Sequence, residues 1–173
     1  TPVYIQLREV VRSKIEDGEY APGTAIPSEH ALADTYGVNR LTVRNAIDAL
    51  VNEGLLKRVK GKGVYVMAKY ERDLEVLGGF SQTMKDRDVL SGKKILQKGQ
   101  RLAGEKYASI LNIQKDDLIY YIKRLDYADE EPIALQEIFI PYNLVPNVEN
   151  IDLSVFSMFE IYKFYGINPV RAW

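Results

Sequence analysis

Cysteine is absent from the 173-residue sequence, and histidine occurs once, as His30. The chain therefore has no disulfide bond and no thiolate zinc site. With a single histidine, it offers few residues for a histidine-based metal cluster or a Ser/His/Asp triad. No apolar run approaches the roughly 18 to 20 residues of a membrane-spanning helix, and the first residues lack the charged-then-apolar pattern of an export signal. The sequence predicts a cytoplasmic protein with no cofactor, no metal and no membrane partner.

Net charge is also low, at −1, but the charge is unevenly distributed. Between Asn39 and Lys62, six Lys and Arg residues stand against two acidic residues, a local charge of +4. Hydrophobic residues make up 46% of the chain and charged residues 27%, which is typical of a globular protein. A basic segment within such a chain favours a polyanionic partner such as nucleic acid.

The first part of the chain has the pattern of three helices and a hairpin. Apolar residues at helical spacing predict helices over residues 3–17, 29–36 and 40–53. Ser28 and Asn39 stand where N-caps belong, and Gly37 provides the turn between the second and third helices. Two strands near residues 56–59 and 64–67 follow, joined by the glycine-containing stretch KGKG. This order is typical of a winged helix-turn-helix.

The pattern changes after Ala68, and we expect a first domain over residues 1–68, a linker over 69–78 and a second domain over 79–173. The later patterns predict a turn and strand, a helix, a β-hairpin with its turn at ADEEP, and an aromatic-rich helix, over residues 91–103, 104–113, 117–144 and 154–166. The fold class is α+β. The stretch INPVRAW predicts the start of a last strand, and because a strand needs a partner, we expect a further segment after Trp173.

The third predicted helix holds the residues that could contact nucleic acid. At about 100° per residue its apolar stripe faces the core, which leaves Leu41 and Arg44 pointing away, with Arg40 and Thr42 near the N-terminal end. An arginine fork can grip guanine O6 and N7 or a phosphate, threonine can donate to a phosphate oxygen, and leucine can rest on a thymine methyl. The blander interpretation is a solvated helix face with a basic hairpin at the surface.

Residues 22–66, PGTAIPSEHALADTYGVNRLTVRNAIDALVNEGLLKRVKGKGVYV, resemble the DNA-binding domain of the GntR family of bacterial transcription regulators. The resemblance covers roughly residues 2–67. Asn39 replaces a commoner serine, and His30 stands where some relatives have arginine. The resemblance implies DNA contacts by Glu29, Asn39, Arg40, Leu41, Thr42, Arg44, Lys60 and Gly61.

The remainder resembles the effector-sensing (UTRA) domain of the HutC branch of that family, similar in fold to chorismate lyase, an antiparallel sheet with helices packed on it. The resemblance rests on GGFSQTMKDR, IKRLDYADEEPIALQEIFIP and the late helix before NPVRA. Free amides at a helix start favour an anion. The resemblance implies a small anionic effector, such as a phosphorylated sugar, bound by Gly79, Phe80, Ser81, Gln82, Arg124, Gln136 and Arg171.

Two departures from that pattern concern the ligand. Asp126 stands where some sugar-phosphate binders have a second arginine, and Gln136 stands where many have glutamate. A carboxylate repels a phosphate, so the sequence leaves open a different anion or a different pose. It also leaves open that Arg124 pairs with Asp126 or another carboxylate and binds no ligand.

Three function classes remain. The sequence favours a homodimeric transcription regulator, a repressor, that reads a palindromic operator in double-stranded DNA and responds to an effector. The second is a lyase-like enzyme acting on a small organic acid, for which the chain offers no histidine after His30 and no convincing carboxylate pair. The third is a non-specific architectural DNA binder, which would not need a sensing domain.

Overall fold

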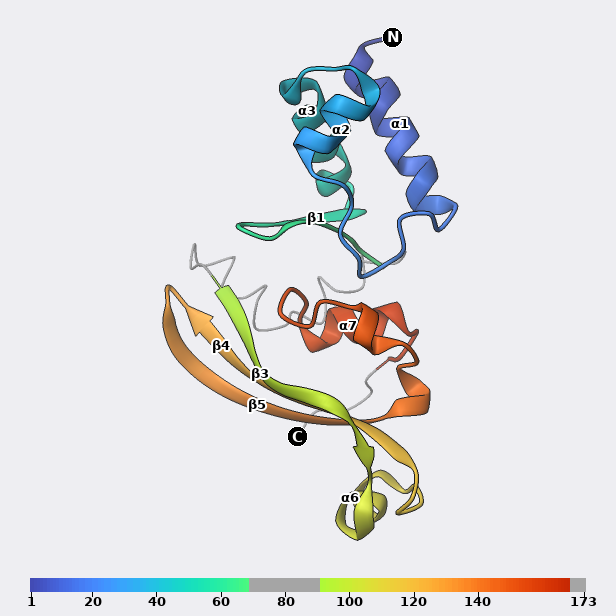
Figure 1. Ribbon diagram of the computed structural model, residues 1–173, viewed down its shortest axis with the longest axis vertical. Helices are drawn as coiled ribbons and strands as arrows, with labels where there is room; N and C mark the ends of the chain where they lie inside the picture. Colours follow the sequence, from blue (N-terminus) through green and yellow to red (C-terminus); the bar gives the residue numbers. More distant parts are fainter. Residues whose placement is uncertain (69–90, 169–173) are drawn as a thin grey trace. The chain divides into compact units, whose positions relative to one another are not determined.

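The computed structural model describes residues 1–68 and 91–168, and the chain divides into two compact units, residues 1–73 and 74–173. The boundaries at 68 and 78 stay a prediction, since the linker over 69–78 lies outside the described residues. The elements of the first unit (Figure 1) are α1 (Val3–Glu16), α2 (Glu29–Tyr36), α3 (Arg40–Asn52), β1 (Leu56–Val59) and β2 (Gly63–Val66).

Both predicted N-caps are confirmed. The backbone N–H of Ala31 donates to Ser28 Oγ over 3.0 Å, and the N–H of Thr42 donates to Asn39 Oδ1 over 2.8 Å. Gly37 ends α2 in the left-handed conformation, with φ 66°, which a side chain would strain. The caps and the glycine together fix where α2 stops and where α3 starts.

The core of the first unit gathers around α3. The predicted stripe, Val43, Ala46, Ile47 and Leu50, is completely buried. It packs in one cluster with residues of the other four elements and the loop before α2, including Leu7, Val11, Ile26, Leu32, Leu56, Val64 and Val66. Burial of one face therefore leaves the opposite face of α3 exposed.

The predicted hairpin after α3 is also confirmed. β1 and β2 pair antiparallel, from Leu56 opposite Val66 to Val59 opposite Gly63. Gly61 and Gly63 have φ values of 78° and 130°, so both need the freedom of glycine. The second strand begins one residue earlier than the sequence indicated, because Gly63 still pairs with Val59.

Asn39→Ala is expected to lower the free energy of unfolding of the first unit by about 1 kcal/mol. The substitution removes the acceptor for the Thr42 N–H and leaves that donor without its side-chain partner. Thermal unfolding followed by circular dichroism measures the change. Asn39→Ser is the matched control and should stay near the native value, so an equal loss in both variants would contradict a capping role.

The elements of the second unit are β3 (Ser91–Leu102), α6 (Gly104–Leu111), β4 (Leu118–Ala128), β5 (Glu131–Pro141), η2 (Tyr142–Leu144), η3 (Val148–Asn150) and α7 (Met158–Phe164). The three strands form an antiparallel sheet in the order β3-β4-β5. Asp129 and Glu130, both with positive φ, form the β4–β5 turn at the predicted place. In Figure 1 the sheet is curved, and α7 lies on its concave side.

Three details of the second unit differ from the sequence prediction or lie beyond it. β3 starts at Ser91, where a turn was expected. The aromatic-rich helix starts only at Met158, because Ser157 and Glu160 form a capping box at its first turn. The predicted last strand falls largely on residues 169–173, outside the described residues. The α+β class itself is confirmed.

Candidate nucleic-acid interface and buried polar cluster

The N-terminal end of α3 is exposed to solvent. Leu41 is 63% exposed despite its apolar side chain, and the side chain of Arg44 is 53% exposed. Arg40 is exposed as well, and Thr42 is half-buried. Asn39 lies directly before them as the cap. The sequence-predicted residues of α3 thus share one accessible end of the helix.

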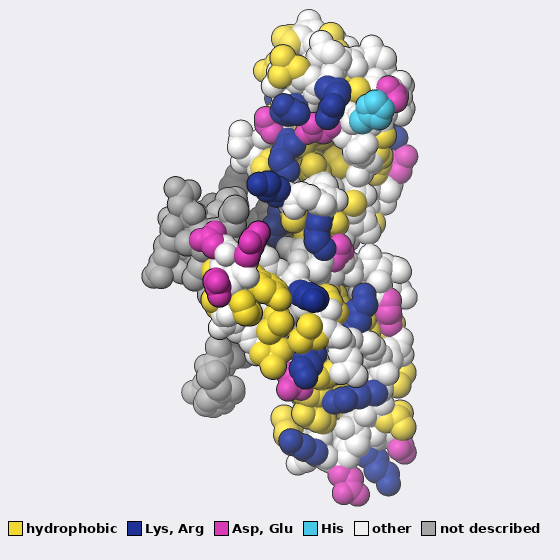
Figure 2. Space-filling model, turned by 60° about the vertical axis from the view of Figure 1, so that its left-hand side comes forward, with side chains coloured by type: hydrophobic (Ala, Val, Ile, Leu, Met, Phe, Trp, Pro, Cys, Tyr) yellow, Lys and Arg dark blue, Asp and Glu magenta, His cyan; other side chains and the backbone are white. Residues whose placement is uncertain are grey.

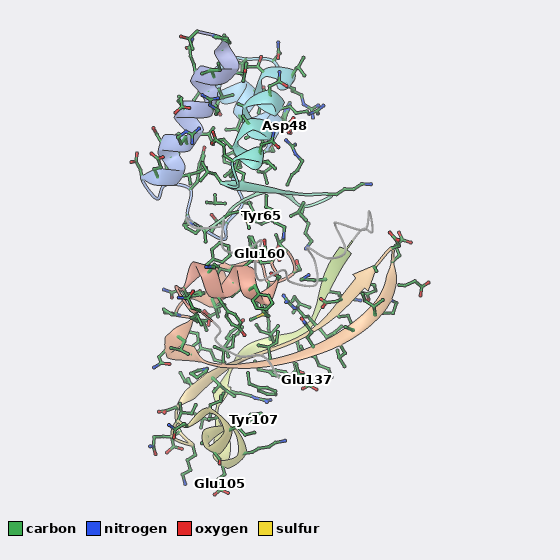
Figure 3. All side chains as sticks on the ribbon, turned by 180° about the vertical axis from the view of Figure 1, so that it is seen from behind. Asp48, Tyr65, Glu105, Tyr107, Glu137 and Glu160 are labelled. Atoms are coloured by element: carbon green, nitrogen blue, oxygen red, sulfur yellow. The ribbon has the colours of Figure 1, made fainter. Side chains whose placement is uncertain are left out.

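Arg44 takes part in an ion-pair cluster with Glu29, Asp48 and Arg58. Arg44 Nη2 lies 3.4 Å from Glu29 Oε2, and Arg58 Nη1 donates to the other oxygen of the same carboxylate. Arg58 Nη2 donates to Asp48 Oδ1 over 2.6 Å. Figure 3 labels Asp48 on α3, and Figure 2 shows Lys and Arg side chains gathered with acidic ones on one face of this unit. The cluster therefore joins α2, α3 and β1.

The electrostatics keep this cluster charged. Burial raises the pKa of Glu29, but the hydrogen bonds and charges of Arg58 and Arg44 outweigh it and hold the pKa below its ordinary value. Burial likewise lowers the pKa of Arg58, and Glu29 and Asp48 outweigh this and raise it. Each group thus favours the ionised form of its partner.

Sequence reasoning counted Arg58 and Asp48 only as charges and missed their contacts. Arg44 and Asp48 are four residues apart on α3 and share a helix face, so this spacing was a signal for an ion-pair cluster. Nothing local in the sequence showed that Arg58, 29 residues after Glu29, would reach the same carboxylate. That contact depends on the fold of the hairpin against the helices.

The hairpin tip and His30 lie at the surface. Lys60 and Gly61 are exposed at the turn between β1 and β2. In the part of the chain that the structure describes, neither Lys60 nor Arg40 has an ion-pair partner. His30 Nε2 lies 3.4 Å from Asp34 Oδ2 on α2, with both side chains about three-quarters exposed. His30 is therefore a surface residue.

Arg124 is the centre of a buried polar cluster in the second unit. It is only 1% exposed. Its Nε donates to Gln136 Oε1 over 2.8 Å, and its Nη1 donates to the backbone oxygens of Leu153 and Phe156 over 3.0 and 2.8 Å. Arg124 thereby ties β4 to β5 and to the segment before α7, and it brings two sequence-predicted residues, Arg124 and Gln136, into contact.

Asp126 lies two residues further along the same face of β4. It is 3% exposed, and its Oδ1 has no hydrogen-bond donor among the described residues. Lys93 Nζ, on β3, is 3.9 Å from this oxygen, and both side chains are buried. Burial lowers the pKa of Arg124, and the charge of Asp126 acts in the opposite direction. The carboxylate therefore affects Arg124 through its charge.

The remaining predicted effector residues, Gly79, Phe80, Ser81, Gln82 and Arg171, lie outside the described residues. Over residues 1–68 and 91–168, no group of acidic residues and histidine is arranged to hold a metal ion. Within the same ranges, every helix is too short or too polar to cross a bilayer.

Comparison with known proteins gives two matched families. Residues 3–66 match the family described as bacterial regulatory proteins, gntR family, and residues 87–172 match the UTRA domain. The chain is 34% identical to the HTH-type transcriptional repressor NagR of Bacillus subtilis (strain 168), over 98% of this chain and 71% of the relative. It is 32% identical to the mannosyl-D-glycerate transport/metabolism system repressor MngR of Escherichia coli (strain K12), over 98% and 69%.

A solved structure supports the same architecture. The crystal structure of PhnF from Mycobacterium smegmatis aligns with a TM-score of 0.51 and 20% identity, over 98% of this chain and 72% of that chain. This similarity concerns the fold alone. The two matched families and the relatives at 34% and 32% identity identify the family of the chain. The chain belongs to the gntR family of bacterial regulatory proteins and is a DNA-binding transcription regulator with a winged helix-turn-helix domain and a UTRA domain.

Proposed function

We propose that this regulator is a homodimeric repressor that reads a palindromic operator with the exposed end of α3. The observation that carries the proposal is the accessible group of Arg40, Leu41 and Arg44 on a helix whose other face is core. A recognition helix presents its N-terminal residues to base edges in the major groove. One such helix reads only a few base pairs, so a two-fold dimer supplies the length of a specific site.

The proposed contacts follow from side-chain chemistry. Arg44 reads guanine through its fork, and Leu41 packs on a thymine methyl. Arg40 and Thr42 bind backbone phosphates near the start of α3, where Asn39 holds the first turn. At the hairpin tip Lys60 neutralises a phosphate, and Gly61 lets the backbone approach the duplex closely.

The second unit is proposed to hold a small anionic effector against the concave side of the sheet. Arg124 and Lys93 bring two positive charges to that interior, and Asp126 brings one negative charge. The name of one relative, MngR, refers to a mannosyl compound, and the proposed effector class includes sugar derivatives such as phosphorylated sugars. We propose that this unit binds its ligand without converting it and that the regulator works in the cytoplasm on double-stranded DNA.

Enrichment of a random duplex library by the full chain tests the DNA-reading role. We expect a single palindromic site to be enriched, because two copies of α3 related by a two-fold axis read inverted half-sites. Sequencing of the bound fraction at physiological salt gives the site, and competition with a scrambled duplex gives the specificity ratio. Equal affinity for the two duplexes would favour non-specific architectural binding and contradict the proposal.

A thermal-shift screen with phosphorylated sugars and small organic acids tests the effector role. A compound that binds the folded chain raises the unfolding temperature by mass action. The same compound should change operator affinity by a coupling of about 1–3 kcal/mol. Chemical conversion of the stabilising compound by the protein would instead support the lyase-like alternative.

A further inference from the structure

The ion-pair cluster of Glu29, Arg44, Asp48 and Arg58 has a feature that DNA attraction does not explain. It holds two positive and two negative side chains, so its net charge is zero. Glu29, at its centre, has a side chain only 15% exposed. A surface that only attracts phosphates would leave its basic side chains without acidic partners. Among the described residues, Arg40 and Lys60 have no ion-pair partner and fit that description. The cluster is therefore better suited to orienting its side chains than to attracting DNA.

The geometry of the cluster is suited to fixing a guanidinium in place. Each oxygen of Glu29 faces a different arginine, with Arg58 on Oε1 and Arg44 on Oε2. The second fork nitrogen of Arg58 is occupied by Asp48, one turn after Arg44 on the same helix. Arg58, on β1, thus holds the carboxylate of Glu29, and this carboxylate in turn contacts one Nη of Arg44. Among the described residues, the other N–H groups of Arg44 have no partner.

We propose that Glu29 and Arg58 are positioning residues that orient Arg44 for base recognition and hold β1 against α2 and α3. This inference rests on the proposed reading role of Arg44. A side chain held in its reading direction before binding loses less conformational entropy on binding. A restrained Arg44 side chain is also less able to turn toward a backbone phosphate when the base sequence is wrong. The cluster therefore acts on sequence specificity, and its acidic members weaken general attraction to DNA.

Glu29→Gln separates this role from simple electrostatics or folding. Glutamine keeps the shape of the side chain and removes one negative charge from the face that meets DNA. We expect affinity for the enriched operator to fall about tenfold, as for partial loss of a bidentate base contact, while affinity for a scrambled duplex stays equal or rises. A purely electrostatic role raises both affinities, and a structural defect lowers both, so either result would overturn the inference.

The matched control is Glu53→Gln. Glu53 also pairs with an arginine, Arg12, at 2.8 Å, but it follows the C-terminal end of α3. The specificity ratio of this control should equal that of the native chain. Should Glu29→Gln unfold, Arg58→Lys takes its place, since lysine keeps the charge but cannot bridge Glu29 and Asp48 as a fork. An unchanged specificity ratio in Arg58→Lys would also overturn the inference.

A double-substitution cycle gives the decisive coupling. In a chain that carries Arg44→Ala, adding Glu29→Gln should cause no further loss of specificity, because the residue being positioned is already gone. Additive losses would mean that Glu29 acts independently of Arg44 and would refute the positioning role. If the native chain itself enriches no site, the proposed function fails. If it does enrich one, and the cycle is additive, only this inference fails.

Discussion

Arg44→Ala is expected to weaken binding to the enriched operator by about 1–3 kcal/mol for each half-site. The side chain projects from the exposed face of α3, 53% accessible, while its helix is anchored by four fully buried residues. Its loss removes a base contact and leaves the helix in place. Because a dimer carries the substitution twice, the total loss is expected to be about double, measured by titration of labelled operator at fixed salt.

Arg44→Lys serves as the control for charge. Lysine keeps the positive charge but lacks the planar fork that matches guanine O6 and N7. We expect it to retain most of the non-specific affinity and the salt dependence, and to lose most of the discrimination against a changed base pair. If Arg44→Lys binds the operator as tightly as the native chain, Arg44 contacts phosphate rather than a base.

The first unit could be predicted from sequence because its signals are local. Ser28, Gly37 and Asn39 act on backbone groups a few residues away, so their types and positions suffice to place the ends of α2 and α3. The apolar stripe of α3 follows from helical periodicity in the same way. Gly61 and Gly63 mark the hairpin turn for a similarly local reason.

Contacts between distant residues could not be predicted in this way. Arg58 meets Glu29 across 29 residues, and Arg124 meets the carbonyl of Phe156 across 32. In both cases the partner is chosen by how strands and helices pack, which residue type and spacing do not encode. The resemblance supplied Arg124 and Gln136 as candidates, but it did not indicate that they bond to one another. It likewise did not show that Asp126 is buried beside Lys93.

Arg124→Met is expected to lower the free energy of unfolding of the second unit by about 3–5 kcal/mol. The substitution leaves the carbonyls of Leu153 and Phe156 without the Arg124 donor, and Asp126 loses a nearby positive charge in the interior. Unsatisfied buried polar groups carry their full desolvation cost. Urea unfolding without added effector measures the loss, and Lys123→Met, a half-buried neighbour on β4, is the matched control.

The absence of effector makes this experiment informative about the role of Arg124. A residue kept only for ligand binding would leave the stability of the ligand-free protein near its native value, and that result would contradict a structural role. Arg124→Lys adds a second comparison, because lysine keeps the charge but cannot reach Gln136 and both carbonyls at once. We therefore expect Arg124→Lys to lose much of the same stability, since the three hydrogen bonds, and not the charge alone, join β4 to β5 and to the segment before α7.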